Sequence, residues 1–75
     1  MKKGYKMYEV YESNLAKLKA IHDDILSRFE GWCQGAKFCG YGNGSYYSKF
    51  VFFTDPDQFE QIKKYVKNNY NAVIV

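Results

Sequence analysis

The chain has little of several residue types on which small proteins often depend. It contains two cysteines, one histidine, one proline and one arginine in 75 residues. Two cysteines are too few for the disulfide framework of a small secreted domain, so we expect free thiols in a reducing cytoplasm. A lone histidine has no second imidazole with which to share a metal ion. The single arginine, Arg28, disfavours bidentate recognition of phosphate or guanine.

Long apolar runs are also missing. The chain begins with Met1, Lys2 and Lys3 and becomes polar within a few residues. No stretch is long enough for a signal peptide or a membrane span, so we predict a cytoplasmic protein that does not bind membranes. A chain of 75 residues is predicted to form one domain, residues 1–75, with a small core.

Aromatic residues, in contrast, are abundant. Eight tyrosines, six phenylalanines and one tryptophan make up 20% of the chain. A core this small cannot enclose so many rings. Tyrosine suits a partly solvent-exposed surface, because its side chain has an apolar ring and a polar hydroxyl group. We therefore expect some aromatic side chains to gather on an exposed surface. The net charge of +3 permits an anionic partner without requiring one.

The hydrophobic period alternates along the chain between two residues and 3.6 residues. This pattern predicts strands at about residues 5–11, 32–41, 46–54 and 72–75, a helix from residue 14 to 29 or 30, and a second helix from residue 56 to a break at residues 68–71. The order strand, helix, strand, strand, helix, strand is that of a ferredoxin-like α+β fold. We therefore predict a four-stranded antiparallel sheet of order 4-1-3-2 with both helices on one face.

Local signals predict the ends of the helices and the hairpin. Ser13 is the expected N-cap of the first helix and Gly31 its stop. Asp55 followed by Pro56 is the clearest helix start. The segment Gly-Asn-Gly-Ser at residues 42–45 predicts a hairpin turn.

The register of this hairpin has two alternatives. A two-residue loop of Asn43 and Gly44 would place Phe38 opposite Lys49, which mixes core and open faces. A three-residue loop at residues 43–45 places Phe38 opposite Phe50 and Tyr41 opposite Tyr47. We favour the second alternative, because it keeps each face chemically uniform.

Two charged residues orient the central strands. Glu9 and Lys49 are disfavoured in a core covered by helices, so both are placed on the uncovered face of the sheet. Because the first and third strands are neighbours in this topology, the two side chains are predicted to form a cross-strand ion pair. The side chains that then face the helices are Tyr8, Val10, Phe50 and Phe52.

The uncovered face of the sheet is the candidate binding surface. A patch of apolar and aromatic side chains on a soluble domain commonly marks an interaction site. The residues predicted to bind a partner there are Tyr5, Met7, Tyr11, Tyr41, Tyr47, Lys49, Val51 and Phe53.

A protein is the predicted partner, either a second copy in a homodimer or a different protein, because tyrosine and methionine are enriched at protein interfaces. Small domains rich in Lys, Tyr and Asn that have no active site are common among phage-encoded regulators and inhibitors. A viral regulator or inhibitor is therefore the role that the composition favours.

A second reading comes from the segment Tyr47-Ser48-Lys49-Phe50-Val51-Phe52-Phe53. It resembles the aromatic third strand of the RNA recognition motif, which shares this order of strands and helices, although Ser48-Lys49 stands where that motif has a basic residue and a glycine. The resemblance implies an alternative function, the binding of RNA or single-stranded DNA. The residues that would act are Tyr5, Tyr47 and Phe53 for base stacking, and Lys6, Lys37 and Lys49 for phosphate contacts.

No constellation of residues predicts catalysis. His22 lies in the buried stripe of the first helix, and Asp23 and Asp24 fall on the solvent side of this helix or its margins. They are not expected to act together with His22, because adjacent helical residues do not face one another. Cys33 and Cys39 are six residues apart on one predicted strand and so share a face, too far apart for a disulfide or a common metal ion. We predict no enzyme, no metal, no cofactor and no small-molecule substrate.

Overall fold

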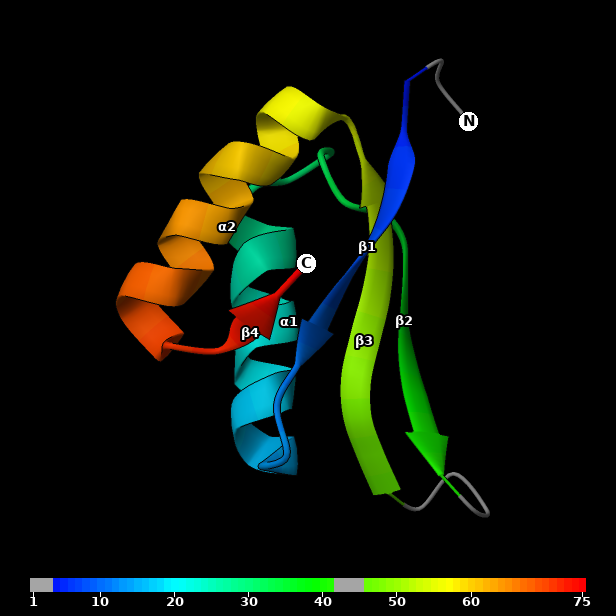
Figure 1. The fold of residues 1–75 in the computed structure, drawn as a ribbon, viewed down its shortest axis with the longest axis vertical. Coiled ribbons are helices and arrows are strands. Elements are labelled where there is room, and N and C mark those ends of the chain that lie inside the picture. The colour runs from blue at the N-terminus through cyan, green and yellow to red at the C-terminus, as the bar shows by residue number, and fades with distance from the viewer. Residues whose placement is uncertain (1–3, 42–45) are drawn as a thin grey trace.

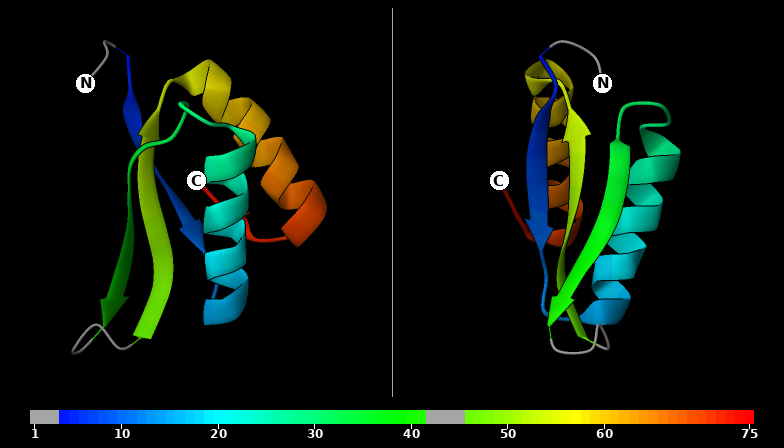
Figure 2. Two further views of the ribbon diagram at one scale, coloured as in Figure 1. Left: turned by 180° about the vertical axis from the view of Figure 1, so that it is seen from behind. Right: turned by 90° about the vertical axis from the view of Figure 1, so that its right-hand side faces the viewer.

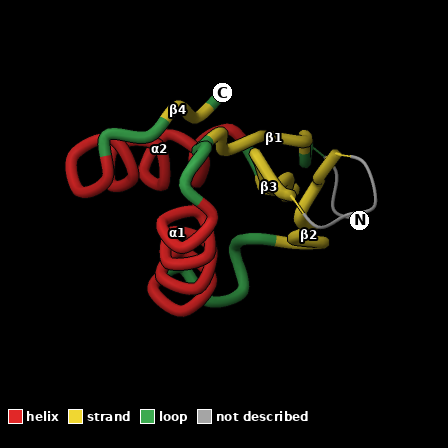
Figure 3. The backbone as a smooth tube through the Cα atoms, turned by 90° about the horizontal axis from the view of Figure 1, so that it is seen from below, coloured by secondary structure: helices red, strands yellow, loops and turns green. Residues whose placement is uncertain are grey.

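The computed structural model describes the backbone of residues 4–41 and 46–75, and the side chains of these residues except residues 40, 41 and 46–48. The elements are β1 (Lys6–Tyr11), α1 (Leu15–Arg28), β2 (Gln34–Tyr41), β3 (Tyr46–Thr54), α2 (Pro56–Tyr70) and β4 (Val73–Ile74) (Figure 1). The sheet has the order β2-β3-β1-β4 with antiparallel neighbours, and Figures 2 and 3 show both helices on one side of it. This is the predicted ferredoxin-like α+β fold, with the order 4-1-3-2 read from the opposite edge.

The core lies between the sheet and the two helices. Val10, Phe50 and Phe52 are fully buried, as the orientation of the central strands predicts. Tyr8 also turns toward the helices and stacks on Phe59 of α2, with 3.7 Å between the ring centroids. The buried apolar side chains are Val10, Leu18, Ile21, Ile25, Phe50, Phe52, Phe59, Ile62, Val66, Ala72 and Ile74.

The helices begin at side-chain caps. Asp55 caps α2 as predicted, because its Oδ1 accepts the Gln58 N–H at 2.9 Å. The prediction for α1 is wrong by one residue: Asn14, not Ser13, is the N-cap, and its Oδ1 accepts the Lys17 N–H at 3.0 Å. An N-cap side chain reaches the amide three residues later, and Lys17 stands at that distance from Asn14.

The second helix ends within the predicted break at residues 68–71, at the last two of these residues. The helix continues through both asparagines to Tyr70, and Asn71 then takes the left-handed conformation (φ 54°) and donates its N–H to the Lys67 carbonyl at 3.2 Å. Asparagine is a weak helix former but an acceptable C-terminal cap, so the tertiary contacts of the last turn decide where α2 ends.

One of these contacts is a cluster between α1 and α2. Tyr65 and Tyr70 each donate a hydroxyl hydrogen bond of 2.6 Å to Oδ2 of Asp24, and Arg28 lies 3.5 Å from Oδ1. The guanidinium of Arg28 also lies 4.4 Å from the centroid of the Tyr65 ring. Asp24 therefore joins the two helices from the margin of the solvent side of α1, where its side chain is 24% exposed. We call these four residues the helix clasp.

The hairpin between β2 and β3 follows the favoured register only in part. Phe38 pairs with Phe50, as predicted, but Tyr41 pairs with Tyr46 rather than with Tyr47. The register shifts between Cys39 and Gly40, so that β3 carries one extra residue there, and Tyr47 pairs with Gly40. The turn at residues 42–45 lies outside the described residues.

A second irregularity lies at the start of β2. The register shifts between Gln34 and Lys37, and Gly35 takes φ 59°, a conformation that favours glycine. A Cβ on Gly35 would lie 3.5 Å from the Phe53 ring. This distance is ordinary van der Waals contact, so the backbone conformation and not the available space favours glycine at this position. The bulge reverses the alternation of side chains along the strand.

Candidate functional site

The open face is the side of the sheet opposite the helices. Residues that pair across an antiparallel sheet lie on the same face, so the register defines its members. From β2 to β4, its described rows are Cys39–Lys49–Tyr11–Val73, Lys37–Val51–Glu9–Val75 and Gln34–Phe53–Met7.

Exposed apolar side chains are concentrated on this face. In the part of the chain whose side chains are described, four large hydrophobic residues are exposed, and all four belong to the open face. Val73 and Val75 are 58% and 60% exposed, Met7 is 53% exposed and Tyr11 is 38% exposed. They occupy β1 and the β4 edge, whereas Val51 and Phe53 on β3 are half-buried. The open face is therefore a solvent-exposed apolar surface, which is a common feature of interaction sites.

The charges at the centre of the open face are paired with one another. Lys49 Nζ donates to Glu9 Oε2 at 2.7 Å, which confirms the predicted cross-strand pair. The Tyr11 hydroxyl donates to Glu9 Oε1 at 2.8 Å, and Lys49 Nζ lies 5.3 Å from the centroid of the Tyr11 ring. Both carboxylate oxygens therefore have donors, and the hydrogen bond from Lys49 is the largest cause of the lowered pKa of Glu9.

Replacing Lys49 tests this arrangement. In Lys49→Met we expect the pKa of Glu9 to rise toward its ordinary value, because the strongest donor to the carboxylate is lost while Tyr11 still donates. The measurement is an NMR titration of the Glu9 side-chain carboxyl. Glu12 is the internal control, since its pKa is lowered mainly by the Asn14 N–H, and it should not change. An unchanged Glu9 titration would show that the ion pair does not form in solution.

The structure brings most of the predicted binding residues together. Met7, Tyr11, Lys49, Val51 and Phe53 lie on the open face. Tyr5 is half-buried and lies one residue before β1, which begins at Lys6. The side chains of the other two predicted residues, Tyr41 and Tyr47, lie outside the described part.

Two exposed members of the open face, Val73 and Val75, were not predicted from the sequence. Val73 and Val75 alternate with buried Ala72 and Ile74, but all four residues are apolar, so the sequence pattern alone does not say which pair faces outward. The pairing of Tyr11 with Val73 settles the orientation. The predicted position of β4 beside β1 was the signal that could have pointed to these two residues. In this position Val73 and Val75 are direct neighbours of Tyr11 and Glu9.

The one histidine of the sequence, His22, packs against neighbouring side chains. The His22 ring packs on Phe38, with 4.6 Å between centroids, and meets Phe50 edge-on. Its Nδ1 lies 3.0 Å from Asp23 Oδ1, so the expectation that these neighbours do not interact is wrong. The Asp23 side chain is 82% exposed, and this pair is a surface contact at the margin of the core.

The two cysteines do not share a face, contrary to the prediction. Cys33 lies before β2 and packs against the core, whereas Cys39 pairs with Lys49 on the open face. The bulge at Gly35 lies between the two cysteines and reverses the alternation on which the prediction depended. Burial raises the pKa of the Cys33 thiol to about 11, so this thiol stays protonated at neutral pH.

Neither the other described residues nor the comparison with known proteins points to a function. Among the residues that the structure describes, no group of three or more His, Cys, Asp or Glu side chains is placed to hold a metal ion. No helix in the described ranges has the length and apolar character needed to cross a membrane. Models of known protein families do not match the chain, and neither the curated proteins nor the solved structures include one that is significantly similar to it.

Proposed function

We propose that the protein is a non-enzymatic binding module that docks on another protein through its open face and also associates with a second copy through this face. The observation that carries the proposal is the gathering of Met7, Tyr11, Val73 and Val75 on one side of the sheet. Burial of exposed apolar area is the main source of affinity between proteins. A module of this kind would regulate or inhibit by covering a surface of its partner.

The paired charges support a protein partner over a nucleic acid. A buried carboxylate or ammonium destabilises an interface when it has no partner. Glu9 and Lys49 satisfy one another, so a protein could cover them without leaving an unpaired charge. Nucleic-acid binding on this face needs free cations, but Lys49 is engaged by Glu9. Lys6 lies across from the buried Thr54 and so belongs to the opposite face of the sheet. On the described open face, this leaves Lys37 to contact phosphate.

Association in solution tests the proposal. We expect the molar mass from sedimentation equilibrium to rise with protein concentration and to change little with salt, because apolar contacts dominate. Val51→Glu places a charge at the centre of the open face and should abolish the association, as should Phe53→Ser. Gln61→Glu, on the exposed side of α2, adds the same charge away from the open face and should leave the association intact.

A different protein as the partner is tested by photo-crosslinking. A photoreactive residue in place of Met7 should give protein adducts in a cell lysate, and these adducts should be lost in Val51→Glu. The same group in place of Gln61 is the matched control. Equal adducts at both positions would contradict the proposal. Binding of a mixed oligonucleotide that weakens steeply with salt and requires Lys37 would favour the nucleic-acid alternative instead.

A further inference from the structure

The outer edge of β4 carries unpaired backbone groups. Glu9 and Val75 exchange two backbone hydrogen bonds, of 2.8 and 2.9 Å, so they form a hydrogen-bonded pair of the antiparallel ladder. The next pair, Val10 and Ile74, is then a non-hydrogen-bonded pair. The N–H and C=O of Ile74 therefore point away from β1, toward the free edge, and no described residue bonds to them.

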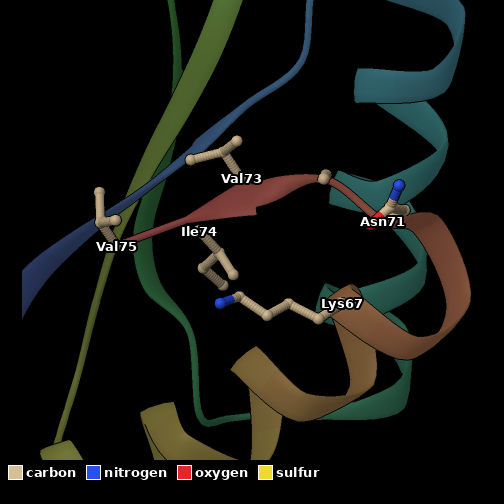
Figure 4. Close-up of a pocket in the computed structure, with 6 residues that line it drawn as sticks. Lys67, Asn71, Val73, Ile74 and Val75 are labelled. Atoms are coloured by element: carbon tan, nitrogen blue, oxygen red, sulfur yellow. The ribbon is translucent and has the colours of Figure 1, made fainter.

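A groove borders this edge. It has a volume of about 310 Å³ and lies between β4 and the last turn of α2. Figure 4 shows the Lys67 side chain extending beneath β4 with its nitrogen toward Ile74, whereas Val73 and Val75 point to the other side of the strand. The lining residues are Lys67, Asn71, Ala72, Val73, Ile74 and Val75.

Among the described residues, the ammonium group of Lys67 in the groove has no acidic partner. Lys67 is exposed, and no described acidic side chain lies within ion-pair distance of it. A ligand that satisfies the groove must offer a backbone donor and acceptor to Ile74 and an anionic group to Lys67. We propose that this groove binds an extended acidic segment of another protein, which adds to the sheet as a fifth strand beside β4 and places a carboxylate on Lys67.

A second copy of the chain fits this edge poorly. Pairing of two β4 strands about a twofold axis at Ile74 would bring both Lys67 ammonium groups close to that axis, where they repel. The opposite edge of the sheet is longer, but β2 carries a bulge at Gly35 and an exposed Lys37, features that discourage pairing with another strand. The β4 edge is therefore the one suited to strand addition.

The probe is the peptide acetyl-Thr-Val-Glu-Val-Thr-amide, whose alternation places Glu beside Lys67 and both Val side chains beside Val73 and Val75. We expect the NMR signal of the Ile74 amide to shift and to gain protection from hydrogen exchange. The dissociation constant should lie in the high-micromolar to millimolar range, because few hydrogen bonds are made. The matched peptide with Gln in place of Glu should bind about two- to five-fold more weakly, as for loss of an exposed ion pair.

Charge reversal completes the test. Lys67→Glu should lose its preference for the Glu peptide and prefer a peptide with Lys at that position, whereas Lys19→Glu, on the exposed side of α1, should bind as the unchanged protein does. Val51→Glu should also bind the peptide normally, which separates this groove from the open face. An unshifted Ile74 amide, or equal affinity for the Glu and Lys peptides, would overturn the proposal. A dimer strengthened by Lys67→Gln, which removes the repulsion at the twofold axis, would assign the edge to a second copy and would also overturn the proposal.

Discussion

Phe50→Ala is expected to lower the free energy of unfolding by about 3–5 kcal/mol, the usual cost of removing a buried phenylalanine ring. Phe50 is fully buried, and its ring contacts those of His22, Phe38 and Phe52. The same substitution at Phe53 should cost roughly 1 kcal/mol, because this half-buried ring lies on the open face of the same strand. Comparing these two losses of unfolding free energy shows whether only one face of the sheet is covered. The proposed open face requires that it is.

The measurement is urea denaturation of both variants beside the unchanged protein. A chain of 75 residues has a total stability of about 4–11 kcal/mol, so Phe50→Ala removes a large part of it. Phe50→Leu, which leaves a smaller cavity, is the variant to use if the alanine protein does not fold. Similar losses at Phe50 and Phe53 would show that both sides of β3 are covered in solution, and the proposed docking surface would then be wrong.

The fold could be predicted from the sequence because few residues decide it. The charged side chains of Glu9 and Lys49 orient the two central strands, and the Asp55-Pro56 pair marks the start of α2. Once these strands are oriented, the alternation of side chains determines most of the open face. The structure accordingly confirms the position of the predicted members on β1 and β3 whose side chains it describes, which are Met7, Tyr11, Lys49, Val51 and Phe53.

Counting alternate residues along a strand assigns side chains to the wrong face beyond any position where the strand carries an extra residue. The bulge at Gly35 turns Cys33 toward the core, and the shift between Cys39 and Gly40 moves Tyr41 opposite Tyr46. A glycine in a predicted strand can signal a bulge, but it does not say on which side of the glycine the register changes. Predictions that count residues across such a position are therefore the ones that are wrong.

The helix clasp could not be derived from the sequence for a different reason. Asp24 and its two tyrosine partners are more than 40 residues apart in the chain, as the separations of 41 and 46 residues show. Whether an acidic residue on a helix meets solvent or a hydroxyl group depends on how the second helix lies against the first. The hydrophobic pattern gives the buried stripe of each helix but not the rotation of one helix relative to the other.

The second large effect is therefore expected at the helix clasp. Asp24→Asn keeps the shape of the side chain but replaces two hydrogen bonds to a charged group by bonds to a neutral one. We expect a loss of about 1–2 kcal/mol, in the lower part of the range for such bonds, because the Asp24 side chain is 24% exposed. Asp23→Asn, at the neighbouring position whose side chain is 82% exposed, is the matched control and should change little.

The pH dependence of this loss distinguishes the clasp from a general effect of charge. The tyrosine hydroxyls lower the pKa of Asp24, so its contribution is present above the ordinary aspartate pKa and is lost as the pH falls through the lowered value. The Asp24 carboxylate raises the pKa of Tyr70 from 10.0 to about 12, so that contribution is present below pH 10.0 and is lost as the pH rises toward about 12. The stability difference between the unchanged protein and Asp24→Asn, measured by urea denaturation across the pH range, should therefore be largest between these limits and shrink at both ends.

The pKa values of Glu9 and Glu12 are also lowered, but both residues are present in the two proteins, so their titration cancels in the difference. A difference that stays constant with pH would mean that the asparagine disturbs packing and that the charged hydrogen bonds contribute nothing.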